Sequence, residues 1–222
     1  MTGASPAQRL HEVRESIARF ARLGARSPDE VTLVAVSKTQ GPDSIRPLIE
    51  AGQREFGENR VQEAQEKWPA LKAESPGVRL HLIGRLQSNK AGDAVSLFDS
   101  IHSVDRPSLV SALAGAMGKS GRRPDCFLQV NVGDEPQKGG CAVADLPALI
   151  EAGREAGLPV RGLMCIPPAD VEPAPYLALL AKLARRHALP ALSMGMSADY
   201  ETAVTLGATH VRVGTALFGE RR

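Results

Sequence analysis

The feature that most constrains the fold is a regular alternation of short apolar runs and longer amphipathic stretches along the chain. Eight runs have the character of strands, and each is followed by a stretch with the character of a helix. The predicted strands are 31–37, 53–57, 79–83, 98–103, 125–132, 160–165, 190–193 and 209–213. The predicted helices are 43–51, 59–73, 86–95, 107–117, 143–156, 174–188, 199–206 and 215–220. Eight such units with short connections predict an α/β fold, an eight-stranded parallel (β/α)8 TIM barrel.

An additional helix is expected before the first strand. Residues 7–23 place apolar side chains at helical spacing, and Ser5 and Pro6 form a start signal for that helix. No linker or shift of composition divides the chain, so residues 1–222 are expected to form one domain. A doubly wound open sheet is the alternative to the barrel.

Charge and cysteine content exclude several classes of protein. The 27 Lys and Arg residues nearly balance the 25 Asp and Glu residues, and the two signs are interspersed, so no nucleic-acid or membrane partner is expected. Three cysteines without Cys-x-x-Cys spacing favour reduced thiols. Neither a leader peptide nor an apolar run of about 18 residues is evident, so a soluble, cytoplasmic protein is expected.

In a TIM barrel, functional groups lie where the strands end, and the first predicted strand ends at Lys38. Lys38 is either a solvated strand cap or an amine at the rim of a dry pocket, where loss of hydration would favour the nucleophilic free amine. The loops after the last two strands carry Gly195, Ser197, Gly214 and Thr215, a pattern typical of phosphate binding. The alternative is that the glycines are ordinary turns and Ser197 is a plain helix cap.

A lysine facing a phosphate site suggests a ligand with a carbonyl at one end and a phosphate at the other. Pyridoxal 5′-phosphate (PLP) meets this description, and so does a phosphorylated sugar in an aldolase. Spacing alone does not separate these two ligands.

Several longer motifs carry a resemblance to a known family. They are "LVAVSKTQ", "FGENRVQEAQEK", "HLIGRLQSNK", "SVDR", "EPQKGG", "GLMCIPP" and the final stretch from "LSMGMSADYETAV" to "VRVGTALFGERR". From about Val31 to Arg222 the chain resembles the pyridoxal phosphate homeostasis protein family, single-domain relatives of the alanine racemase barrel. The resemblance implies a fold type III PLP barrel with the cofactor held as a Schiff base on Lys38.

The resemblance also implies roles for other residues. Arg212 would face the pyridine nitrogen, Ser197, Gly214 and Thr215 would hold the phosphate, and Asn59 would lie near the ring. Arg60 departs from the pattern, because many relatives carry an aromatic residue there, and this affects the contacts expected at the rim. A carboxylate paired with Arg212 is the alternative to a cofactor contact.

Two functions remain open after the sequence analysis. The first is a PLP-binding protein that buffers or delivers the cofactor, without turnover of its own, to apo forms of PLP-dependent enzymes. The second is a PLP-dependent amino-acid racemase or decarboxylase. No second catalytic base is evident, since Tyr176 and Tyr200 both fall in predicted helices, and the binding role is favoured. With no second domain evident, a monomer is expected.

Other motifs are assigned no function. The sequence "GKSG" at 118–121 resembles the end of a P-loop, but it follows a helix and Leu113 stands where the first glycine should be. The histidines lack metal spacing, so no metal site is expected, and His81 and His102 are expected to form core or rim hydrogen bonds. Cys165 is expected to be buried, and Lys138 is expected to be a solvated charge or a mobile group that handles the cofactor.

Overall fold

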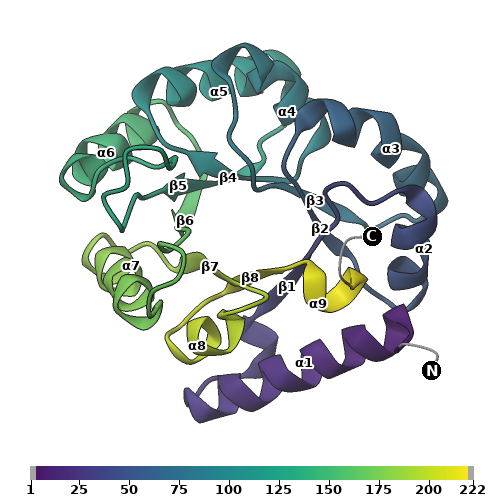
Figure 1. The fold of residues 1–222 in the computed structure, drawn as a ribbon. Coiled ribbons are helices and arrows are strands. Elements are labelled where there is room, and N and C mark those ends of the chain that lie inside the picture. Colours follow the sequence, from purple (N-terminus) through teal and green to yellow (C-terminus); the bar gives the residue numbers. More distant parts are fainter. Residues whose placement is uncertain (1–3, 220–222) are drawn as a thin grey trace.

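Parallel pairing of the first strand with the last closes the sheet into a barrel in the computed structural model, which describes residues 4–219 (Figure 1). Each strand pairs in parallel with the next along the chain, so the doubly wound open sheet is wrong and the TIM barrel is confirmed. The strands are β1 (Thr32–Val36), β2 (Glu55–Glu58), β3 (Arg79–Leu82), β4 (Ser100–Val104), β5 (Asp125–Gln129), β6 (Val160–Met164), β7 (Ala191–Met196) and β8 (His210–Val213).

Helices form the outer layer of the barrel (Figure 1). They are α1 (Pro6–Leu23), α2 (Pro42–Glu50), α3 (Val61–Glu74), α4 (Ala91–Leu97), α5 (Pro107–Ser120), α6 (Leu146–Glu155), α7 (Ala174–Arg186), α8 (Tyr200–Thr205) and α9 (Thr215–Phe218). The predicted extra helix is α1, where the side chains of Ser5 and Gln8 form a capping box. It packs against α8 and α9 beside the junction of β8 and β1. Among residues 4–219, none of the helices combines the length and apolar character that a membrane span needs.

Element boundaries differ from the prediction mainly at the ends of strands. α3 begins at Val61 and not at residue 59, because Arg60 is extended and forms the N-cap position. The strand predicted at 190–193 continues to Met196, and the next helix begins only at Tyr200. The last predicted helix, 215–220, ends at Phe218, and residue 220 lies outside the described residues.

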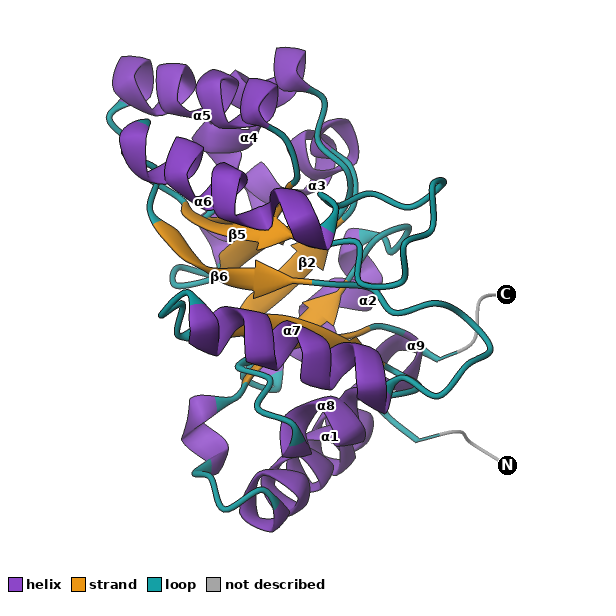
Figure 2. Ribbon diagram, turned by 90° about the vertical axis from the view of Figure 1, so that its left-hand side faces the viewer, coloured by secondary structure: helices purple, strands orange, loops and turns teal. Residues whose placement is uncertain are grey.

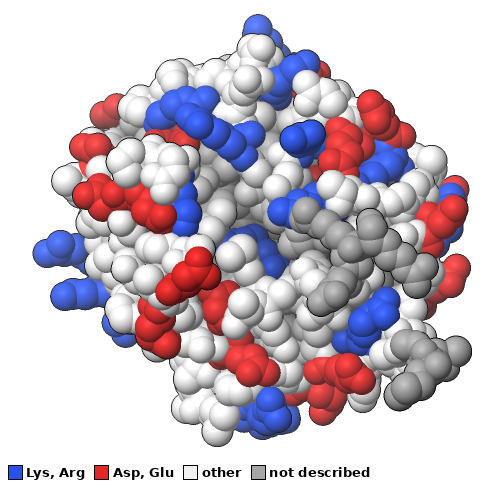
Figure 3. Space-filling model, in the orientation of Figure 1, with Lys and Arg blue, Asp and Glu red and all other residues white. Residues whose placement is uncertain are grey.

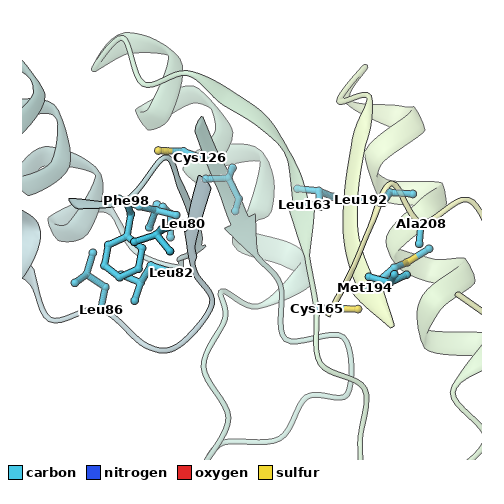
Figure 4. Close-up of a cluster of buried hydrophobic side chains, with 14 of the residues drawn as sticks. Leu80, Leu82, Leu86, Phe98, Cys126, Leu163, Cys165, Leu192, Met194 and Ala208 are labelled. Carbon is cyan, nitrogen blue, oxygen red and sulfur yellow. The ribbon is translucent and has the colours of Figure 1, made fainter. Parts of the chain in front are cut away.

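Apolar side chains fill the layer between the sheet and the helices. Figure 4 shows part of this core, where Leu80 and Leu82 of β3 lie with Leu86 and Phe98. In β8, Val211 and Val213 belong to this outer core. Because side chains alternate along a strand, Arg212 between them points into the barrel. The barrel interior is therefore more polar than the layer around it.

The carboxyl ends of the strands open on the face that is seen in Figure 1. In Figure 2 the arrowheads of β5 and β6 point toward the side that carries long loops. The space-filling view of that face has a hollow at its centre with Lys and Arg atoms inside it (Figure 3). The fold therefore brings the loops expected to carry function around one basic depression.

Close packing of β6 against β7 depends on Gly162. A Cβ atom at this position would lie 1.9 Å from the Ala191 carbonyl oxygen, which is backbone and cannot move without disturbing the sheet. We expect Gly162→Ala to lower the free energy of unfolding by about 3 kcal/mol. Chemical denaturation of the purified protein measures this loss.

Gly115→Ala is the matched control for Gly162→Ala. Gly115 is exposed in α5, and a Cβ atom there meets no other atom within 4 Å. This substitution should raise the free energy of unfolding by about 0.5–1 kcal/mol, because alanine favours the helix over glycine. Equal stability of the Gly162→Ala variant and the wild type would contradict the packing argument.

Candidate functional site

A cavity of about 510 Å³ lies at the mouth of the barrel. All six residues that the sequence assigned to a binding site line it: Lys38, Asn59, Ser197, Arg212, Gly214 and Thr215. The other lining residues are Val36, Ile83, Gly84, Arg85, Gln129, Gly139, Ile166, Met196 and Ala198. Residues from both ends of the chain therefore meet around one open cavity.

Lys38 lies two residues after β1, at the point where the chain leaves the barrel wall. Its side chain is half-buried and lines the cavity, so Lys38 is not a freely solvated strand cap. The next residue, Thr39, has a φ of 64°, and its N–H donates to a carboxylate oxygen of Glu63 at 2.6 Å. A left-handed φ is unfavourable for a β-branched residue and needs support from surrounding contacts.

Lys67 of α3 provides that support from beneath the loop. Its Nζ donates to the backbone oxygens of Ser37 at 2.9 Å and Gln40 at 3.1 Å, on either side of Lys38. The same Nζ lies 2.9 Å from Oε1 of Glu58, which is fully buried. A buried ammonium thus ties both ends of the turn to α3 and to the end of β2, and this fixes the base of the Lys38 side chain.

Glu58 joins this clamp to β1 and to the core. Its Oε1 accepts hydrogen bonds from the Ser37 hydroxyl at 2.6 Å and from the Trp68 indole at 2.9 Å. Lys67 was not predicted from the sequence, because Glu63 and Lys67 at i,i+4 spacing have the pattern of an ordinary solvated ion pair. The signal that could have found it is the buried Trp68 beside it, which places this part of α3 against the sheet.

Arg212 of β8 is buried and points into the barrel below the cavity. Its Nη1 donates to the Ser193 hydroxyl at 2.7 Å, and its Nη2 donates to the Cys165 carbonyl at 2.8 Å. Burial lowers the pKa of the guanidinium, and Cys165 and Asp199 oppose this effect. Within residues 4–219 no carboxylate forms an ion pair with it, so the alternative of a carboxylate-paired Arg212 is wrong. A cation held only by neutral acceptors leaves its charge available to the cavity.

The loops after β7 and β8 meet directly. The Gly214 N–H donates to the Ser197 hydroxyl at 3.2 Å. Ser197 is not the helix cap of the alternative interpretation, since α8 begins after Asp199, whose carboxylate accepts the Met196 N–H at 2.6 Å. Ser197 lies three residues before the first residue of α8, Tyr200. The two loops thus present a hydroxyl and a backbone N–H side by side, with Thr215 exposed next to them.

Gly84 explains how Asn59 is held at the cavity. A Cβ atom at Gly84 would lie 2.2 Å from the Asn59 backbone oxygen, so only glycine allows the loop after β3 to pack against the chain that leaves β2. Asn59 is half-buried there, whereas Arg60 is exposed.

Gln129 and Arg85 line the cavity and were not predicted. Gln129 ends β5, and its side-chain amide donates to the Gly139 carbonyl at 3.0 Å, which closes the long loop onto the rim. As a polar residue directly after the apolar run 126–128, it could have been found from the sequence. Arg85 is exposed at the rim, and nothing in its sequence context distinguishes it from a surface cation.

The remaining candidates do not line the cavity. Burial raises the pKa of the Cys165 thiol to about 12, so it is an inert core group. Lys138 is half-buried, lies 2.6 Å from Glu135 and donates to the Pro167 carbonyl. Residues 118–121 fall at the end of α5 and not between a strand and a helix. Among residues 4–219, no group of three or more His, Cys, Asp and Glu residues could hold a metal ion.

Solved structures share this fold. The chain superposes on the structure of PipY from Synechococcus elongatus without PLP with a TM-score of 0.80 and 43% identity, covering 91% of this chain and 99% of that chain. The structure of PipY with PLP bound matches with a TM-score of 0.74 and 42% identity, covering 91% and 100%. An alanine racemase of Clostridium difficile shares the fold at 12% identity with a TM-score of 0.70, and the match covers 94% of this chain and 56% of that one.

Sequence comparison identifies relatives along nearly the whole chain. The family described as "Alanine racemase, N-terminal domain" matches residues 10–222. The pyridoxal phosphate homeostasis protein of Pseudomonas aeruginosa is 43% identical, covering 97% of this chain and 95% of the relative. The protein of the same name from Escherichia coli K12 is 38% identical over 97% of this chain and 96% of the relative. With its closed barrel and its lysine at the mouth, this chain belongs to the pyridoxal phosphate homeostasis protein family, a branch of the alanine racemase N-terminal domains.

Proposed function

We propose that this chain binds PLP in the mouth cavity as a Schiff base on Lys38 and takes part in intracellular PLP homeostasis. The observation that carries the proposal is the convergence of Lys38, Arg212 and the paired loops at Ser197 and Gly214 on one cavity. The Lys38 amine matches the aldehyde of PLP, and the buried Arg212 cation matches its pyridine ring. The donors of the two loops match its phosphate. When bound, PLP supplies the aldehyde carbon that the lysine amine attacks.

The phosphate is proposed to bind at Ser197, Gly214 and Thr215, where two hydroxyls are present and the ligand would replace the Ser197 hydroxyl as the acceptor of the Gly214 N–H. A Cβ atom at Gly214 would make only ordinary contacts with Val36, at 3.4 Å, so packing within the protein does not demand a glycine there. Close approach of a ligand to the backbone would explain a glycine at position 214, whereas packing within the protein does not. Lys38, Arg85 and Arg212 make the lining cationic, as a phosphate dianion requires.

Arg212 is proposed to face the pyridine nitrogen, with Asn59 near the ring. A guanidinium disfavours a proton on the neighbouring nitrogen, so the bound ring is a weaker electron sink than one paired with a carboxylate. Its neutral acceptors, Ser193 and Cys165, hold the guanidinium in place without cancelling its charge.

The composition of the cavity wall favours binding over turnover. Among the described residues that line it there is no Tyr, His, Cys, Asp or Glu. Racemisation needs an acid or base on each face of the substrate, and Lys38 can serve only one face. We therefore favour a carrier that acts as a monomer in the cytoplasm and passes PLP to apo forms of PLP-dependent enzymes, in line with the name of its relatives.

Substitution of Lys38 tests the proposed Schiff base. Lys38→Ala should fold, lose the visible absorbance band of the PLP complex and still bind PLP weakly and reversibly, because the phosphate contacts remain. Lys38→Arg should also lose the band, since a guanidinium stays charged at neutral pH and is a poor nucleophile. The measurement is an absorbance spectrum before and after borohydride, followed by mass mapping of the reduced adduct.

Lys90→Ala is the control for this experiment, because Lys90 lies in the loop after β3, is half-buried like Lys38 and pairs with Asp93 at 3.4 Å. It should keep the wild-type spectrum. A reduced adduct on Lys90 or Lys138, with Lys38 unmodified, would remove Lys38 from the proposed role.

Enlarging Gly214 tests the proposed phosphate cradle. Gly214→Leu should weaken PLP binding by about tenfold or more, equivalent to about 1.4 kcal/mol, because the side chain obstructs access to the backbone N–H. Its effect on pyridoxal, which lacks the phosphate, should be much smaller. Titration of each ligand by absorbance gives the two dissociation constants.

Gly214→Ala is the matched variant, since its Cβ atom fits beside Val36. We expect its affinity for PLP to lie between those of the wild type and Gly214→Leu. An equal loss of affinity for PLP and pyridoxal in Gly214→Leu would assign the loop a role other than phosphate binding.

A further inference from the structure

A continuous chain of hydrogen bonds crosses the barrel interior from its bottom to its mouth. Glu55 Oε2 lies 2.6 Å from His81 Nε2, and His81 Nδ1 lies 2.9 Å from His102 Nε2. His102 Nδ1 lies 2.7 Å from the Ser193 hydroxyl, which lies 2.7 Å from Nη1 of Arg212. The side chains of His81, His102 and Ser193 thus connect the Glu55 carboxylate, near the bottom of the barrel, to the Arg212 guanidinium below the cavity. The five residues come from β2, β3, β4, β7 and β8.

Most of the side chains in this hydrogen-bond chain are buried from solvent. His81, His102, Ser193 and Arg212 are each exposed by 4% or less. Only the Glu55 side chain, 26% exposed, reaches solvent, where it lies 3.7 Å from Arg79. Buried polar groups must satisfy one another, so the order of donors and acceptors inside the barrel is tightly constrained.

The chemistry of the two ends fixes the direction of every bond between them. A guanidinium can only donate and a carboxylate can only accept. Ser193 accepts from Arg212, and with neutral imidazoles its own proton goes to His102 Nδ1, because His81 must then donate from Nε2 to the Glu55 carboxylate. A neutral imidazole carries one N–H, so His102 donates from Nε2 to His81, and His81 donates from Nε2 to Glu55.

The surroundings of this hydrogen-bond chain agree with a neutral imidazole at His102. Burial lowers the pKa of His102 well below its usual range, and the nearby His81, His210 and Arg212 lower it further. At the open end, burial raises the pKa of Glu55, but the hydrogen bond from His81 and the nearby positive groups outweigh it, so the net pKa is lowered. The carboxylate is therefore an ionised acceptor at neutral pH.

We propose that Glu55 is a positioning residue for Arg212, the terminal acceptor that orders the chain through His81, His102 and Ser193. With Nη1 committed to Ser193 and Nη2 to the Cys165 carbonyl, the guanidinium is held in one orientation below the cavity. This inference concerns the free protein and stands whether or not the cavity holds PLP. The alternative is that Glu55 serves only as a local partner for Arg79 at the bottom of the barrel.

Nitrogen NMR of the histidine side chains tests the direction of the chain in the full protein without added cofactor. Both His81 and His102 should be neutral and protonated at Nε2 at pH 7. A proton at Nδ1 of either ring, or a charged imidazolium, would overturn the proposal. This measurement needs no variant and does not depend on the proposed function.

The rate at which the Arg212 guanidinium protons exchange with water tests the role of Glu55. Glu55→Leu removes the terminal acceptor and should raise this rate about tenfold, equivalent to about 1.4 kcal/mol of lost protection. Glu55→Gln keeps an acceptor oxygen and should stay within about twofold of the wild type, since the role requires acceptance and not charge. Arg79→Met removes only the outer ion pair and should leave the rate unchanged.

Ser193→Ala is the positive control, because it breaks the last link and must accelerate the exchange. If Glu55→Leu leaves the exchange at the wild-type rate while Ser193→Ala raises it, Glu55 does not position Arg212 and the proposal fails. If Glu55→Leu does not fold, the tautomers of the wild-type protein still decide the question.

Discussion

The parallel pairing of β1 with β8 is the contact on which the candidate site depends. Its register places Val34 opposite Arg212 and Ala35 opposite Val213, so the loop with Lys38 emerges beside the loop with Gly214. Residues about 175 positions apart in the sequence meet because the sheet closes, and an open sheet would separate them. The geometry of the cavity is therefore a property of barrel closure more than of any single loop.

Two buried cations near the cavity are accommodated in different ways. Lys67 is paired with Glu58 and Glu63 and donates to backbone oxygens, so its charge is locally compensated. Arg212 has only neutral acceptors within the described part of the chain. Removing a charge from water is costly unless it is compensated, so the first cation suits a structural role. The second is suited to interact with a negatively charged ligand in the cavity.

Much of the fold was predictable from the sequence, because parallel strands buried on both faces leave apolar runs that alternate with amphipathic helices. Lys38 and Gly214 were also predictable, since they follow directly from where strands end. The contact between Ser197 and Gly214 was not, because it depends on the unexpected extension of β7 to Met196. The hydrogen bonds of His81 and His102 were anticipated, but their order required knowledge of which side chains share the barrel interior.

Because β1 pairs with β8, the two sides of the cavity are synthesised at different times. During synthesis, Lys38 and the whole clamp around it leave the exit tunnel long before Arg212 and Gly214 are made. Until the last strand is translated, the first strand has an unpaired edge and the lysine has no cavity wall opposite it. A nascent chain can therefore present the Lys38 amine but cannot enclose a ligand, and retention of a small molecule begins only after β8 has been translated.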